Sequence, residues 1–272
     1  TYYVTVTDGN GCTDSSSVTI AEPTAFAVSI TSQTNVSCHG GNDGKAATNA
    51  TGGTSPYSYA WSSGASITTS NNFANANNLT EGNVTAIVTD ANGCVDSSSV
   101  TITEPLVLGV SITAQTNANC NGASTGSATV SGSGGTGAYG YVWSDGQTAA
   151  IATGLGAGTY YVTVTDGNGC TDSSSVILTE PFALVSSASV TTVISCNGDA
   201  NGEVTASQIG GTSLYTYLWN TGGTAALETG LGAGTYFVTV TDGNGCTDSS
   251  SVTIAEPASL VSSASVTTVI SC

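Results

Sequence analysis

Cysteine is the residue type in this sequence with the clearest chemical potential. Eight cysteines occur among 272 residues, four of them directly after an Asn-Gly pair and four placed 26 residues further on. The first group is Cys12, Cys94, Cys170 and Cys246, and the second is Cys38, Cys120, Cys196 and Cys272. No pair has Cys-x-x-Cys spacing and the single histidine, His39, cannot complete repeated zinc sites. An even, repeating set of this kind predicts disulfide bonds.

Calcium binding is the second chemistry to consider. The segment Asn-x-Asp199-x-Asn201-Gly resembles the start of an EF-hand loop, but its twelfth position is Gln208 rather than Glu. We therefore predict a turn there, with calcium as the weaker alternative. Asp242 and Asp248 recur in every copy of the repeat described below, and we expect them to cap turns beside a hairpin. A calcium site involving them is again the alternative, and no other cofactor is expected.

The charge inventory excludes several classes of function. The chain has 18 acidic residues against one Lys and no Arg, for a net charge of -17. Nucleic acid and anionic membrane surfaces would be repelled, and no apolar stretch is long enough to span a bilayer. One Lys and one His cannot supply repeated catalytic triads or phosphate clamps, so we predict that the chain is not an enzyme.

A sequence repeat must position these residues. The segment that opens at Thr1 recurs at Thr159 and Thr235, with a diverged copy from Asn83, and Glu-Pro closes each unit. The predicted domains are a partial repeat with the last two strands (1–23), whole repeats at 24–105, 106–181 and 182–257, and a partial repeat with the first strand (258–272). The first whole repeat carries extra residues after Trp61, which we expect to form a loop.

Each repeat shows short strands divided by turn signals, and no segment shows the 3.6-residue apolar period of a helix. In the third repeat we predict strands over 184–194, 203–207 and 215–219, a fourth from 225, and a final hairpin around 242–245. The fold class is thus all-β, a tandem array of small β-sandwich domains. The expected core anchors are Trp61, Trp143, Trp219, Tyr160 and Tyr236. An exposed, carbohydrate-stacking aromatic strand is the alternative.

The repeat resembles the SprB-type repeats of large Bacteroidota cell-surface proteins, including gliding-motility adhesins. The resemblance rests on Cys196-Asn-Gly, on Gly210-Gly-Thr with Tyr215-x-Tyr-x-Trp, on Gly-Thr-Tyr236-x-Val-Thr-Val-Thr-Asp-x-Asn-Gly-Cys246, and on Glu256-Pro. It implies an Ig-like or PKD-like module of a long, exported, extracellular protein. The first repeat departs from the pattern, because Asn-Val-Thr from Asn83 replaces Gly-Thr-Tyr.

The disulfide connectivity stays open between two patterns. The favoured pattern closes each repeat on itself, with Cys38–Cys94, Cys120–Cys170 and Cys196–Cys246, and leaves Cys12 and Cys272 to partners elsewhere. The alternative joins cysteines 26 residues apart, such as Cys12–Cys38 and Cys246–Cys272. Strand parity decides between them. With one strand between the Trp strand and the Tyr-Val-Thr-Val strand, both cysteines of a repeat would fall at the same end of the sandwich.

These features favour a disulfide-stabilised structural rod of an extracellular adhesin or surface filament, serving adhesion or gliding motility. The alternatives are a glycan- or calcium-binding repeat module and spacer domains of a large secreted enzyme. Expected partners are surface glycans or other cell-surface proteins, with self-association into fibres. Because the chain does not begin with Met, we expect it to be an excerpt of a longer polypeptide.

Overall fold

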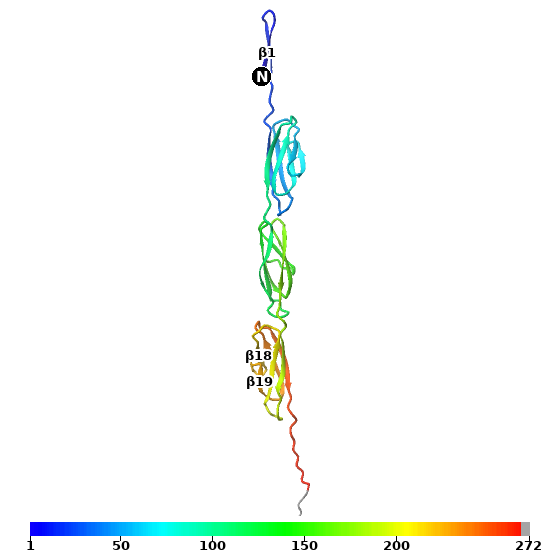
Figure 1. Cartoon of the computed structure of the whole chain (residues 1–272), viewed down its shortest axis with the longest axis vertical. Coiled ribbons are helices and arrows are strands. Elements are labelled where there is room, and N and C mark those ends of the chain that lie inside the picture. The colour runs from blue at the N-terminus through cyan, green and yellow to red at the C-terminus, as the bar shows by residue number, and fades with distance from the viewer. Residues whose placement is uncertain (268–272) are drawn as a thin grey trace, which may run out of the picture. The chain divides into compact units, whose positions relative to one another are not determined.

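The computed structural model describes residues 1–267, and these contain β-strands and turns with no helix (Figure 1). They form two compact units, one made of residues 1–109, 132–139 and 164–172, and the other of the remaining residues. The strands up to residue 102 are β1 (Tyr2–Thr7), β2 (Thr13–Val18), β3 (Ala27–Thr34), β4 (Gly44–Thr51), β5 (Ser58–Trp61), β6 (Ser66–Ser70), β7 (Phe73–Leu79), β8 (Gly82–Thr89) and β9 (Val95–Ile102).

The strands of the second and third repeats follow the same order as those of the first, without β6. Those of the second are β10 (Gly109–Thr116), β11 (Gly126–Ser133), β12 (Gly140–Trp143), β13 (Ile151–Leu155), β14 (Gly158–Thr165) and β15 (Thr171–Leu178). Those of the third are β16 (Val185–Thr192), β17 (Gly202–Ile209), β18 (Thr216–Trp219), β19 (Leu227–Leu231), β20 (Gly234–Thr241) and β21 (Thr247–Ile254). The expected all-β sandwich class is confirmed.

The third repeat is a sandwich of two three-stranded sheets, ordered β16-β17-β19 and β18-β20-β21. Side chains alternate along each strand, so one face of each sheet is buried. Val204 and Leu231 from the first sheet meet Trp219, Val238 and Ile254 from the second in one apolar cluster. The Trp219 indole is 1% exposed, and its N–H donates to the Ala225 carbonyl at 2.9 Å.

Strand direction in this repeat departs from simple alternation. β18 runs antiparallel to β20, with Trp219 opposite Val238, and β19 runs antiparallel to β17, with Leu231 opposite Gly202. β17 and β20 both begin at the end of the sandwich where Leu231 lies, so β18 and β19 run the same way. These two short strands are therefore two halves of one crossing that changes sheets midway.

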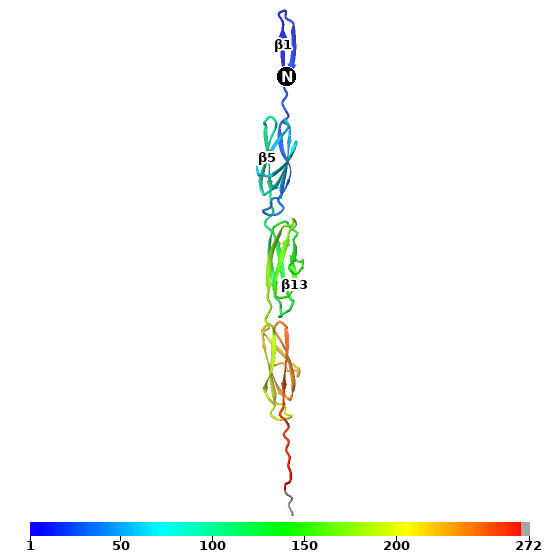
Figure 2. The ribbon, with the colours of Figure 1, turned by 90° about the vertical axis from the view of Figure 1, so that its right-hand side faces the viewer.

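The first repeat has the same plan with one addition. Its sheets are ordered β3-β4-β7-β6 and β5-β8-β9, around a core that includes Val36, Leu79, Trp61 and Ile102. The extra residues after Trp61, expected as a loop, instead include strand β6, which pairs with β7. Figure 2 labels β5 in this repeat and β13 in the second. In the second repeat the sheets are ordered β10-β11-β13 and β12-β14-β15.

Residues 1–23 contain a two-stranded hairpin with the register of β20–β21. Tyr2 pairs with Val18, as Tyr236 pairs with Val252. Val4 of this hairpin is 60% exposed, whereas the equivalent Val238 is 1% exposed. The hairpin turn and register are thus local properties of the sequence, since they form without the rest of the sandwich. Over the part of the chain that the structure describes, no helix is long and apolar enough to cross a membrane.

Candidate functional site, disulfide junctions between consecutive repeats

Two disulfide bonds join neighbouring repeats. Cys38 of the first repeat is bonded to Cys170 of the second, with a sequence separation of 132 residues. Cys120 of the second repeat is bonded to Cys246 of the third, with a separation of 126. The Cα–Cα distance is 5.8 Å in each, within the usual range. Each bond lies inside one of the two compact units.

The predicted connectivities are therefore wrong, for Cys38–Cys94, Cys120–Cys170 and Cys196–Cys246 as for the 26-residue alternative. The expectation failed because it assumed that consecutive strands reverse direction. Since β18 and β19 run the same way, the two cysteines of a repeat lie at opposite ends of its sandwich. Cys196 lies at the end where Gly202 faces Leu231, and Cys246 follows the turn at the far end of β20.

One half of each junction is a tight turn, which we call the Cys turn (Asp90–Cys94, Asp166–Cys170 and Asp242–Cys246). In the second repeat, Asp166 Oδ1 accepts the backbone N–H groups of Asn168 and Cys170, each at 2.9 Å. Asp166 Oδ2 accepts the backbone N–H of Thr136 at 2.8 Å. The Asp242 carboxylate has the same three bonds, from Asn244, Cys246 and Thr212. One carboxylate thus fixes the backbone on which the cysteine stands.

These hydrogen bonds set the charge state of the turn. The backbone N–H of Thr136 is the main reason that the pKa of Asp166 is lowered, against the opposing effect of burial. For Asp242, burial alone would raise the pKa, but the N–H groups of Thr212, Cys246 and Asn244 together lower it. The carboxylates are consequently ionised at neutral pH and accept stronger bonds than a neutral acid would.

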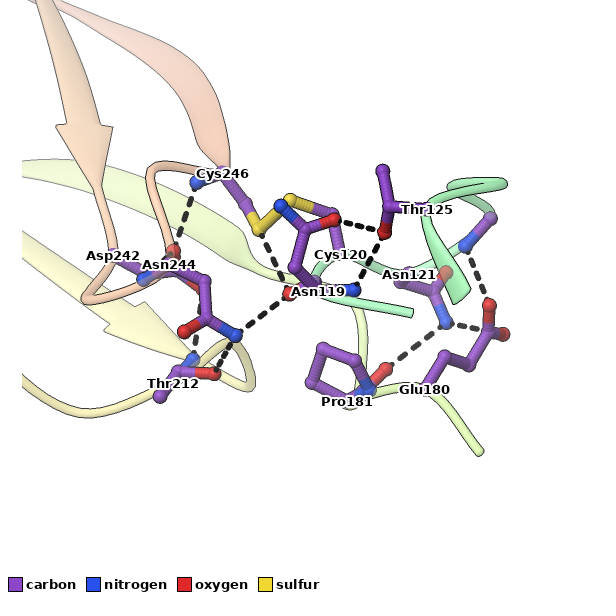
Figure 3. The surroundings of a disulfide bond; sticks show 11 residues. Asn119, Cys120, Asn121, Thr125, Glu180, Pro181, Thr212, Asp242, Asn244 and Cys246 are labelled. Atoms are coloured by element: carbon purple, nitrogen blue, oxygen red, sulfur yellow. Dashed lines mark hydrogen bonds between the residues drawn. A yellow bond between two sulfur atoms is a disulfide. The ribbon is translucent and has the colours of Figure 1, made fainter. Parts of the chain in front are cut away.

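An asparagine amide crosses each junction beside the sulfur bridge. Asn244 Nδ2 donates to the Asn119 carbonyl of the preceding repeat at 2.8 Å and to Thr212 Oγ1 of its own repeat at 3.0 Å (Figure 3). Asn168 likewise donates to the carbonyl of Ser37 at 2.8 Å. In both cases the acceptor belongs to the residue just before the bonded cysteine. The amide therefore holds the partner backbone in position for the disulfide.

The other half of each junction is the Cys loop (residues 37–43, 119–125 and 195–201). The glutamate of the recurring Glu-Pro pair folds back onto it. Glu180 Oε2 accepts the N–H of Gly122 at 2.7 Å, and its Oε1 accepts the amide of Asn121 at 2.8 Å (Figure 3). Glu104 and Glu256 accept the N–H groups of the equivalent glycines, Gly40 and Gly198. The Glu-Pro motif thus anchors the loop that presents the cysteine.

Sequence reasoning did not assign these roles to Asn168, Asn244 or the Glu-Pro glutamates. A signal was present, because Asn-Gly-Cys and Glu-Pro recur in each repeat. Their partners lie in a neighbouring repeat or about 60 residues earlier in the same one, and such contacts leave no periodic pattern. Recurrence alone marks the residues without indicating what they contact.

The predicted core anchors are confirmed for tryptophan. Trp61 is 8% exposed, Trp143 2% and Trp219 1%, so these indoles are not available to stack on a ligand. Tyr160 and Tyr236 are half-buried, and their hydroxyls donate to the carbonyls of Gly156 and Gly232. They close the loop before their strand as corner residues do.

The calcium candidates do not come together. Asp199 and Asn201 belong to the Cys loop of the third repeat, where Asn201 Oδ1 accepts the N–H of Ser195. Asp242 lies in the Cys turn at the opposite end, and Asp248 accepts both the N–H and the hydroxyl of Ser186. Among residues 1–267 no three His, Cys, Asp or Glu side chains are grouped as metal ligands. Calcium binding stays a prediction.

Three further cysteines, Cys12, Cys94 and Cys196, are unpaired and exposed. Cys272 lies outside the described residues.

Comparison with solved structures finds immunoglobulin-type and other surface domains at low similarity. Three N-terminal domains of the outer capsid protein Hoc of bacteriophage RB49 match with 14% identity and a TM-score of 0.34, covering 85% of this chain and 97% of that one. Dpr2 Ig1-Ig2 in complex with DIP-Theta matches with 10% identity and a TM-score of 0.30, covering 84% and 98%. Such similarity carries no argument about function. No curated protein matches the chain.

The family comparison is more specific. The SprB repeat model matches residues 30–66, 112–148 and 188–224, once in each whole repeat. Each match includes a Cys loop and ends just after the Trp strand. The chain is therefore an array of SprB repeats with immunoglobulin-like β-sandwich architecture.

Proposed function

We propose that this chain is a non-catalytic, force-carrying segment of an extracellular adhesin or surface filament. The observation that supports this is the staggered disulfide connectivity, in which the loops closed by Cys38–Cys170 and Cys120–Cys246 overlap. Each pair of neighbouring repeats is joined twice, by the backbone connector and by a sulfur bridge. The double connection limits hinge motion at the connector and resists separation of neighbouring repeats.

The overlap of the loops creates a covalent bypass for tension. With both bonds formed, the shortest covalent route through the chain uses residues 1–38, 120–170 and 246–272, which is 116 of 272 residues. Complete loss of folded structure could not extend the chain beyond this route. A reduced, unfolded chain would be longer by roughly 500 Å, at about 3.3–3.6 Å per residue. The bonds therefore protect the reach of the segment even when a sandwich opens.

The same bonds stabilise the folded state. On the chain-entropy model, closing a loop of more than 100 residues contributes ~4–5 kcal/mol. A sandwich of fewer than 85 residues buries a small core, so a contribution of this size matters. Disulfides persist in oxidising compartments, which supports an extracellular location. The acidic, nearly Lys- and Arg-free surface offers few cleavage sites to trypsin-like proteases.

The role in adhesion or gliding motility is the finer part of the proposal. It is supported by the SprB repeat match and by a fold whose conspicuous contacts are structural. The proposed partners are other cell-surface proteins. Surface glycans are less favoured, since the tryptophans expected as their alternative contact points are buried.

Single-molecule pulling on the full chain, with handles at its two ends, tests the force-carrying function. Under oxidising conditions the fully unfolded contour length should correspond to about 116 residues, and after reduction to all 272. The double variant Cys94→Ser/Cys196→Ser is the matched control, because those cysteines are unpaired, and it should behave as the parent does. An oxidised chain that extends to its full length would contradict the proposal.

A further inference from the structure

The unpaired Cys94 stands in a Cys turn that is already built like the two occupied ones. Asp90 Oδ1 accepts the N–H groups of Asn92 at 2.9 Å and Cys94 at 2.8 Å. Asp90 Oδ2 accepts the N–H of Thr54 at 2.8 Å, and Asn92 Nδ2 donates to Thr54 Oγ1 at 2.9 Å. The distances match those in the other repeats. What differs is the second acceptor, the carbonyl that Asn168 and Asn244 each find in a neighbouring repeat.

The unpaired Cys196 stands in a Cys loop that is equally complete. The N–H of Ser195 donates to Asn201 Oδ1 at 3.2 Å, as the N–H of Asn119 donates to Thr125. The N–H of Gly198 donates to Glu256 at 2.8 Å. The carbonyl of Ser195 occupies the position from which Ser37 and Asn119 accept an asparagine amide. Cys196 is exposed.

The hairpin at the start of the chain offers an internal comparison. Asp8 accepts the N–H groups of Asn10 and Cys12 at 2.9 Å, so the turn itself forms there. It lacks the Gly-Gly-Thr loop whose threonine, Thr54 in the first repeat, both donates to the aspartate and accepts from the asparagine. Cys12 therefore stands in an incomplete turn, and Cys94 in a complete one.

We propose that the Cys94 turn and the Cys196 loop are complementary halves of one further junction, and that a second copy of this chain fills each of them, head to tail. Turn against loop reproduces the pairing seen twice within the chain. Turn against turn supplies no carbonyl for Asn92, and loop against loop supplies no amide for Ser195. An interface between two different surfaces propagates from copy to copy and yields open chains when its rotation does not close. This goes beyond the proposed function, which rests on the bonds already formed within one chain.

The bond requires an oxidant, and oxidised glutathione supplies it by thiol–disulfide exchange. The Cys94 thiolate attacks oxidised glutathione, forming a mixed disulfide and releasing one reduced glutathione. The Cys196 thiolate of the second copy then attacks the Cys94 sulfur and releases the second. Two protein thiols and one oxidised glutathione thus give one intermolecular disulfide and two reduced glutathiones.

The test uses two variants of the full chain in a Cys12→Ser/Cys272→Ser background, one with Cys94→Ser and one with Cys196→Ser. In a glutathione buffer, each alone should stay monomeric, and their mixture should form one disulfide-linked dimer that joins Cys196 of the first variant to Cys94 of the second. The background protein carrying both cysteines should form a ladder of oligomers. Equal dimer formation by each variant alone would mean indiscriminate thiol chemistry and would overturn the proposal. So would a mixture that stays monomeric, or an intrachain Cys94–Cys196 bond.

Asn92→Ala in the Cys94-bearing variant separates a built junction from an exposed thiol. Loss of one amide–carbonyl bond should lower the dimer yield at a fixed glutathione ratio roughly five-fold, while alkylation of Cys94 by a small reagent stays unchanged. Asn10→Ala is the matched control and should leave the yield unaltered. An unchanged yield with Asn92→Ala would overturn the proposed geometry. Cys38–Cys170 and Cys120–Cys246 are intact in all these proteins, so failure here leaves the pulling experiment as an independent test of the proposed function.

Discussion

Asn244 donates its side-chain amide to the backbone carbonyl of Asn119, a residue 125 positions earlier in the chain. The bond lies beside the disulfide between Cys120 and Cys246, and the Cys246 sulfur is 3.4 Å from the same carbonyl oxygen. The equivalent relationship joins Asn168 to Ser37. A hydrogen bond and a covalent bond thus act on the same short piece of backbone, and each should affect the strength of the other.

We predict that Asn244→Ala makes the Cys120–Cys246 bond easier to reduce. Losing one hydrogen bond of about 1 kcal/mol should shift the equilibrium with glutathione roughly five-fold toward the dithiol. The measurement is a redox titration with thiol trapping and mass spectrometry of each cysteine pair. Cys38–Cys170 in the same molecule is the internal control and should not shift. Equal shifts in both bonds would argue against a local role for the amide.

Glu180→Ala should loosen the Cys loop of the second repeat. Its carboxylate accepts the N–H of Gly122 and the amide of Asn121, and a hydrogen bond to an exposed charged group is worth about 1 kcal/mol. We expect faster hydrogen exchange at Gly122, with little change elsewhere. Glu81→Ala, at an exposed position of the first repeat, is the matched control. If Gly122 exchanges at the parent rate, the Glu-Pro motif does not anchor the loop.

The fold should lose stability in acid through the Cys turns. Asp90, Asp166 and Asp242 all have pKa values lowered from the ordinary 3.8 by the hydrogen bonds they accept. A lowered native pKa gives stability that is present above the unfolded pKa and is lost as pH falls through the native value. The urea midpoint should therefore be level from about pH 7 to pH 5 and should decline below about pH 4. Asp166→Asn should reduce the slope of that decline, and an unchanged slope would place the acid sensitivity elsewhere.

Two tyrosines in equivalent strands should respond differently to loss of their hydroxyl. The Tyr59 hydroxyl is buried with no hydrogen-bond partner, and burial is the main cause of its raised pKa. The Tyr217 hydroxyl donates to Gln208 at 2.8 Å. Tyr59→Phe should be neutral or stabilising and Tyr217→Phe should cost about 1 kcal/mol. Hydrogen exchange in the first and third repeats of the full chain measures each effect, and a larger loss for Tyr59→Phe would contradict the assignment.

Local patterns in the sequence predicted the sandwich but not its junctions. Alternation at Tyr215, Tyr217 and Trp219 identified the buried face of β18, because side-chain direction follows from the strand itself. The change of sheet between β18 and β19 leaves no such pattern. The strands are four and five residues long, and their direction is set by pairing with β20 and β17. An error in that direction moves a cysteine to the wrong end of the sandwich, which is why the connectivity could not be obtained from the sequence.

The insertion in the first repeat was missed for a related reason. All five residues of β6 are exposed, so the strand has no alternation of apolar and polar side chains and looks like a polar loop. Its structure comes from pairing with β7, where Ile67 lies opposite Ala76. Strand pairing across a turn is a tertiary property, and a segment with both faces in solvent reveals little of it.

Disulfide mapping of the non-reduced chain tests the central claim most directly. Because the chain has one Lys and no Arg, trypsin would leave it almost whole, and a protease that cleaves at Asp and Glu should be used with mass spectrometry. The account predicts peptides joining Cys38 to Cys170 and Cys120 to Cys246, with Cys94 and Cys196 free in the monomer. Peptides joining Cys120 to Cys170, or Cys196 to Cys246, would show repeats closed on themselves and would contradict it.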